Sequence, residues 1–80
     1  MSSTYIIKSL KDLGYYYGHS QDPEKRLAEH NSKKVKSTKH RITFILHYVE
    51  TFDSKSLAYR QEMFFKSAEG KKYLKEKGII

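Results

Sequence analysis

The sequence contains no cysteine. This absence excludes disulfide bonds, thiolate metal sites and cysteine nucleophiles. Long apolar runs are missing too, because the longest mostly apolar segment, ITFILHYV, is far shorter than the roughly 20 residues that a membrane-spanning helix needs. The first residues, MSSTYIIKSL, do not show the basic stretch followed by an apolar one that marks a signal peptide. We therefore expect a soluble, cytoplasmic protein without a membrane partner.

Negative charge is also scarce. Sixteen lysine and arginine residues face nine aspartate and glutamate residues, so the net charge is +7 and the pI is about 9.6. Such an excess attracts polyanions, and nucleic acid is the most common partner of this kind. A length of 80 residues leaves room for a single small domain, which we expect to span residues 1–80.

The first half of the chain predicts a β-hairpin followed by a helix. Residues 4–9 (TYIIKS) and 15–19 (YYYGH) are rich in β-branched and aromatic side chains, and Asp12 and Gly14 supply turn formers between them. A helix start follows, with Asp22 at the N-cap and Pro23 at the first helical position. We expect this helix to end at about Asn31.

The second half predicts a further strand and two helices. Residues 32–41 show neither helical nor strand periodicity and predict an exposed loop. Residues 42–50 are apolar on both faces, which favours a central strand covered on each side. Residues 55–67 have a helical apolar stripe, and residues 71–77 predict a short third helix after a glycine interruption. The expected fold is an α+β domain of order β-β-α-β-α-α, with a three-stranded, mainly antiparallel sheet flanked by helices.

Three consecutive tyrosines precede Gly18. Strand alternation directs Tyr15, Tyr17 and His19 to one face of the sheet and Tyr16 to the other, together with Gly18. Because glycine has no side chain, the surface beside Tyr16 is open to close approach. The pattern thus separates Tyr16 from its two neighbours, which are most simply packing residues.

Four motifs in order resemble one known family. They are STY at residues 3–5, YYG at residues 16–18, the pair Arg26 and His30 in DPEKRLAEH, and Glu62 in SLAYRQEMFFKS. Together they resemble the GIY-YIG nuclease domain, especially its small stand-alone members of the UvrC-like endonuclease type, over essentially the whole chain. The sequence departs from the family in having Ser-Thr where the first motif has Gly-Ile. It also has no late Asn of the kind that supports the site in some members.

The resemblance implies an endonuclease or nickase that hydrolyses phosphodiester bonds in DNA, with RNA still open as a substrate. It implies that Tyr16 acts as general base, that Tyr5 supports it, and that Glu62 holds one divalent metal, Mg²⁺ or Mn²⁺. A nearby guanidinium favours a phenolate, so Arg26 could activate a tyrosine or clamp the phosphate. His30 follows on nearly the same helix edge and could hydrogen-bond Tyr16 or the phosphate. Sequence selection would have to come from a protein partner or from substrate shape.

A basic segment, KKVKSTKHR, follows the first predicted helix. It is either an exposed, mobile loop or an arm that contacts phosphates without reading sequence. Its charged residues are the expected nucleic-acid contacts: Lys33, Lys34, Lys36, Lys39 and Arg41.

Each expected site residue also has an ordinary explanation. The two motif tyrosines could be sheet aromatics that pack across a hairpin, and the helical arginine and histidine could form a solvated face. Glu62 alone would more often be a surface carboxylate beside Lys66, four residues later. The joint order of the motifs favours a nuclease. The alternative is a nucleic-acid-binding module on the same fold with weak or no catalysis.

Overall fold

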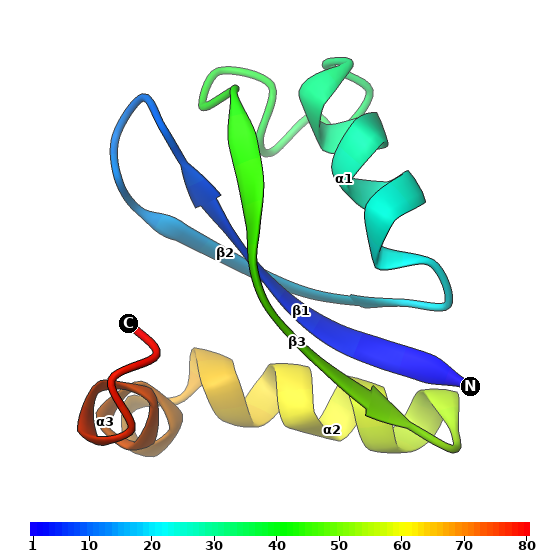
Figure 1. The fold of residues 1–80 in the computed structure, drawn as a ribbon, viewed down its shortest axis with the longest axis vertical. Coiled ribbons are helices and arrows are strands. Elements are labelled where there is room, and N and C mark those ends of the chain that lie inside the picture. Colours follow the sequence, from blue (N-terminus) through cyan, green and yellow to red (C-terminus); the bar gives the residue numbers. More distant parts are fainter.

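The computed structural model describes residues 1–80 and contains three strands and three helices in the expected order β-β-α-β-α-α (Figure 1). The predicted α+β class is confirmed. None of the helices combines the length and apolar character that would let it cross a membrane. The elements are β1 (Ser2–Ser9), β2 (Tyr15–Ser20), α1 (Pro23–Asn31), β3 (Phe44–Phe52), α2 (Lys55–Lys66) and α3 (Ala68–Glu76).

The sheet is antiparallel with strand order β2-β1-β3. The prediction that residues 42–50 form the central strand is therefore wrong, since β3 is an edge strand and β1 is central. The central strand was not recognised because it contains several hydroxyl side chains. All are buried, and most of them have internal hydrogen bonds: the Thr4 hydroxyl donates to the Ala58 carbonyl at 2.7 Å, and the Ser3 and Thr51 hydroxyls lie 3.0 Å apart. On β3, by contrast, the apolar Ile45 is 42% exposed.

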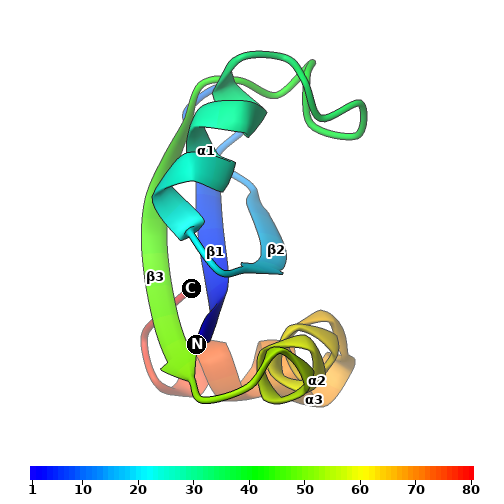
Figure 2. The same cartoon turned by 90° about the vertical axis from the view of Figure 1, so that its right-hand side faces the viewer.

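Each face of the sheet carries its own small core. On one face Tyr5, Ile7 and Phe44 pack together under α1. On the other face Ile6 packs against residues of α2 and α3, namely Phe65 and Leu74. Figures 1 and 2 show α1 near one end of the twisted sheet and the α2–α3 pair near the other. Because alternate residues of β1 enter the two cores, this strand joins the whole domain.

Local capping signals set the helix starts. The Asp22 carboxylate accepts a hydrogen bond from the Lys25 N–H, as expected from an N-cap aspartate. The third helix begins earlier than predicted, because Ser67 caps it and Gly70 lies inside it. A Cβ at Gly70 would overlap the Phe64 carbonyl oxygen. The glycine is therefore required for α3 to pack closely against the end of α2, and it does not interrupt the helix.

Candidate active site

Gly18 lies directly beneath the Tyr5 ring. The two residues are paired across β1 and β2, and a Cβ at position 18 would overlap the Tyr5 hydroxyl. Tyr5 is 2% exposed, so the ring fills the space that the glycine leaves. The register places Tyr16 on this same face, opposite Ile7. The close approach expected beside Tyr16 is thus made by the protein's own Tyr5.

His30 is the centre of a buried polar chain. Its Nε2 lies 3.0 Å from the Tyr5 hydroxyl, and its Nδ1 lies 2.8 Å from the Thr38 hydroxyl. Tyr16 contacts the same imidazole through its ring edge, with ring centroids 4.9 Å apart and planes inclined by 62°. The hydroxyl bonded to His30 therefore belongs to Tyr5. Tyr16 packs against the ring.

The contacts around Thr38 favour one tautomer of His30. The Thr38 hydroxyl donates to the Val35 carbonyl at 3.4 Å, so its oxygen is free to accept the His30 Nδ1–H. This leaves Nε2 as the acceptor for the Tyr5 O–H. Burial lowers the pKa of His30 to about 4, and the positive charge of Arg26 contributes to the lowering. The imidazole is therefore neutral near pH 7, as this arrangement requires.

Tyr5 is held as a proton donor. Burial raises the pKa of its phenol to about 12, and the nearby Arg26 guanidinium opposes that rise only in part. One guanidinium nitrogen of Arg26 donates to the Glu29 carboxylate at 3.0 Å. Arg26 has five N–H donors in a planar fork, so others remain for an anion. The arginine and histidine of α1 thus surround Tyr5.

Glu62 approaches from α2 and is buried, with 8% of its surface exposed. One carboxylate oxygen lies 2.7 Å from His19 Nδ1, and the other accepts from Lys66 Nζ at 2.7 Å. The pairing with Lys66 considered from the sequence is present, although the carboxylate is not a surface group. The Glu62 charge is also one of the smaller causes that raise the Tyr5 pKa. Glu62 is thus held on the α2 side of the sheet, next to His19, within electrostatic range of Tyr5.

Glu62 is the buried carboxylate that could hold a hard cation. A carboxylate offers about four lone-pair sites, and His19 and Lys66 occupy two of them. No cluster of three or more His, Cys, Asp or Glu residues surrounds it. A cation held here would have Glu62 as its protein ligand, and its other ligands would have to be water and substrate phosphate.

The basic segment projects beside α1 (Figure 2) and is fastened at two points. Thr38 is fully buried, in contrast to the expectation of an exposed loop, because its hydroxyl bonds His30. Arg41 is the second point: its Nε donates to Asp12 at 2.7 Å, and its guanidinium stacks over Phe44. Neither contact could be read from the composition of the segment.

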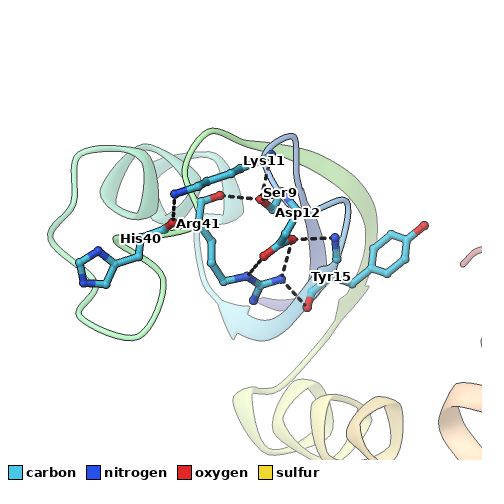
Figure 3. A network of polar contacts seen from close by, with 7 residues as sticks. Ser9, Lys11, Asp12, Tyr15, His40 and Arg41 are labelled. Carbon is cyan, nitrogen blue, oxygen red and sulfur yellow. Dashed lines mark hydrogen bonds and ion pairs between the residues drawn. The ribbon is translucent and has the colours of Figure 1, made fainter.

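Figure 3 shows how the end of this segment meets the β1–β2 turn. The Ser9 hydroxyl donates to the Arg41 carbonyl at 2.6 Å, and Lys11 Nζ donates to the His40 carbonyl at 3.0 Å. Hydrogen bonding by Arg41 lowers the pKa of Asp12 to about 2, so this carboxylate stays charged. Arg41 is thus engaged by the β1–β2 turn of the protein itself. The remaining expected phosphate contacts have no ion-pair partner in the structure: Lys33, Lys34, Lys36 and Lys39.

Comparison with known proteins identifies the family. The family described as the GIY-YIG catalytic domain matches residues 1–75. The chain belongs to the GIY-YIG family. This membership agrees with the ordered motifs, with Tyr5 and Tyr16 on adjacent strands, with Arg26 and His30 on α1, and with Glu62 on α2.

Small GIY-YIG relatives carry the designation UPF0213. One from Bacillus licheniformis is 36% identical over 80 residues, covering 95% of this chain and 82% of the relative. Another, from Staphylococcus saprophyticus, is 42% identical over 72 residues, covering 89% and 87%. The solution NMR structure of the UPF0213 protein BH0048 from Bacillus halodurans has 34% identity and a TM-score of 0.54, covering 95% of this chain and 84% of that one.

Sequence reasoning did not assign a role to two residues in contact with the site. His19 orients Glu62, and Thr38 orients His30. Strand alternation does direct His19 away from Tyr16, toward the face that α2 covers, so a signal for it existed. Thr38 lies among lysines in an aperiodic segment, and nothing in its surroundings indicates burial.

Proposed function

We propose that this GIY-YIG protein is a metal-dependent endonuclease that hydrolyses phosphodiester bonds in DNA. The observation that carries the proposal is the cluster of Tyr5, His30 and Arg26, with the buried Glu62 within electrostatic range of Tyr5. A phosphate placed at this edge would face a guanidinium, tyrosine hydroxyls and a carboxylate that can hold a cation.

The two tyrosines are proposed to have different tasks. Tyr5 has a pKa of about 12, and its hydroxyl donates a hydrogen bond to His30 Nε2. It is therefore a poor base. Tyr16 is half-buried and its hydroxyl has no hydrogen-bond partner in the protein. These properties support the assignment of Tyr16 as the general base that accepts a proton from the attacking water, and of Tyr5 as a supporting hydroxyl.

The remaining roles follow from charge. Arg26 would hold the phosphate through its free N–H groups. Glu62 would hold Mg²⁺ or Mn²⁺, which would supply charge neutralisation at the leaving oxygen. The basic segment after α1 would contact phosphates on either side and contribute affinity without sequence readout.

The proposed substrate is DNA, selected by its structure more than by its sequence. RNA is the second candidate, because backbone contacts alone do not separate the two. A protein partner is the proposed source of any sequence selection. We place the activity in the cytoplasm.

The test is cleavage of supercoiled plasmid, branched duplexes and single strands with Mg²⁺, with Mn²⁺ and with a chelator. Loss of a positioned general base typically costs ~10²–10⁴-fold in rate, so we expect a loss of this size in Tyr16→Phe. Glu62→Gln should lose cleavage with either metal ion, and Tyr5→Phe should lose less activity than Tyr16→Phe. Cleavage that persists in both Tyr16→Phe and Glu62→Gln would contradict the assignment.

A second candidate function is nucleic-acid binding with weak or no catalysis. The observation in its favour is that both Glu62 oxygens are already engaged, by His19 and by Lys66. In that case wild type would cleave no substrate of the panel. Its affinity would also be unaffected by Tyr16→Phe and Glu62→Gln.

A further inference from the structure

A polar pocket opens next to the Glu62 side of the site, where β2 ends and α2 begins. Its volume is about 350 Å³, and it contains neither a hydrophobic side chain nor a carboxylate. Every side chain that lines it can donate a hydrogen bond: Ser2, His19, Ser20, Gln21 and Lys55. Such a lining is suited to an anion and unsuited to an apolar ligand or a metal cation.

The charge of the pocket is positive. Lys55 has no ion-pair partner, and it occupies the first position of α2. No acidic residue stands in the first turn of this helix, so its positive end is not neutralised from within. Asp53, which precedes the N-cap residue Ser54 of α2, does not line the pocket. Helix N-termini of this kind favour phosphate and other anions.

Ser2 supplies a separate observation. The residue is only 3% exposed, and its hydroxyl has no hydrogen-bond partner in the protein, whereas the hydroxyls of the next two residues, Ser3 and Thr4, are both bonded. The structure contains no enclosed side-chain donor or acceptor without a partner, so the Ser2 hydroxyl opens into the pocket that it lines. The hydroxyl is therefore reached from the pocket and is free to donate a hydrogen bond to an anion there.

We propose that this pocket binds a phosphodiester group of a nucleic-acid strand, as a second phosphate site beside the cleavage site. The inference rests on the proposed function and extends it to the path of the substrate. His19 lines the pocket and also contacts Glu62 at 2.7 Å, so the two sites are separated by one side chain. The strand would run past Glu62, with the cleaved phosphate near Arg26 and a neighbouring phosphate near Lys55.

The experiment measures binding of fluorescent single-stranded and duplex oligonucleotides over a range of salt concentrations, in a chelator so that nothing is cleaved. Lys55→Gln is compared with Lys72→Gln, which removes the same charge from an exposed lysine of α3. Each phosphate that a lysine no longer neutralises reduces the slope of log K against log salt by ~0.9 for duplex and ~0.7 for single strands. We expect this reduction and a several-fold weaker binding for Lys55→Gln only. Equal effects of the two substitutions would overturn the proposal.

A Ser2→Ala variant and an NMR titration test whether the phosphate contact lies in this pocket. Ser2→Ala should weaken binding several-fold and leave the salt slope unchanged, since it removes a neutral donor. Titration with an oligonucleotide should shift the amide resonances of His19 and Gln21, and inorganic phosphate alone should shift the same resonances more weakly. Absence of the oligonucleotide shift would overturn the site, as would a response to inorganic phosphate only. Because none of these measurements needs turnover, a protein that cleaves nothing would still reveal the pocket.

Discussion

At the scale of single residues, contacts within the protein hold the functional groups of the candidate site in position. Tyr5 occupies the space over Gly18. His30 accepts a hydrogen bond from the Tyr5 hydroxyl, and Thr38 orients the imidazole of His30. Strand alternation was sufficient to separate Tyr16 from Tyr15 and Tyr17. It could not reveal that the ring above Gly18 is Tyr5, because that depends on the register between β1 and β2.

Thr38 gives a prediction at this scale. Thr38→Val keeps the shape but removes the acceptor for His30 Nδ1–H, which leaves a buried donor unpaired and lowers the free energy of unfolding by ~1–3 kcal/mol. His30 should then shift toward the Nε2–H tautomer, visible in the ¹⁵N chemical shifts of its ring.

Thr38→Ser provides the matched control, since it keeps the hydroxyl, and both the stability and the ring shifts should stay near wild type. If Val and Ser variants gave the same ¹⁵N shifts, Thr38 would have only a packing role. The ring shifts are informative whether or not the protein cleaves DNA.

At the scale of elements, the features that depend on neighbouring residues, such as helix caps and the hairpin, could be predicted from the sequence. The N-cap at Asp22 and the hairpin of β1 and β2 are as expected. The predicted position of β3 in the sheet was wrong because strand order depends on which strands pair, and the apolar content of one strand does not decide that. The predicted start of α3 was wrong because Gly70 serves packing between helices and does not end one.

The segment after α1 gives a prediction at this scale. It presents lysines without ion-pair partners between α1 and the anchored Arg41, so their charges should act on phosphates together. Replacing Lys33, Lys34 and Lys36 by glutamine should lower the salt slope of duplex binding by ~0.9 for each phosphate that is no longer neutralised. Unfolding should stay unchanged, which urea titration of the triple variant would measure.

Arg41→Gln should show the opposite pattern, because Arg41 is engaged by Asp12. Its main effect should be a lower unfolding midpoint, with a smaller effect on the salt slope than the triple variant. A triple variant that bound DNA with the wild-type slope would remove the segment from the interface.

At the scale of the whole molecule, a net charge of +7 is carried by a domain with two small cores. Composition predicted the charge and the class of partner. It could not predict that a histidine and a glutamate would be buried in so small a chain. Both are tolerated because each polar atom of these side chains has a partner.

The buried histidine makes global stability depend on pH. Burial, then Arg26, lowers the pKa of His30 from its ordinary 6.5 to about 4 in the folded protein. Between these two values the unfolded chain binds more protons, so acid favours unfolding. The contribution of His30 to the free energy of unfolding is fully present above pH 6.5 and falls as the pH drops from 6.5 to about 4. Below about pH 4 it stays constant.

Urea unfolding at several pH values across this interval and just above it measures the dependence. His30→Asn, which cannot titrate, should be less stable near neutral pH but flatter with pH over the interval. An equally steep dependence in His30→Asn would assign the effect to other groups.

The central position of β1 has a consequence for motion. This strand supplies Tyr5, is bonded on both edges and enters both cores. Its amide hydrogens are therefore expected to exchange with solvent only when the entire domain opens, whereas those of the outer edges of β2 and β3 exchange through local fraying. The Tyr5 hydroxyl stands on the slowest-exchanging part of the chain, and Glu62 stands on a separate helix. We therefore expect any adjustment of the site to a substrate to involve the helices α1 and α2, which carry Arg26 and Glu62, more than the strand that carries Tyr5.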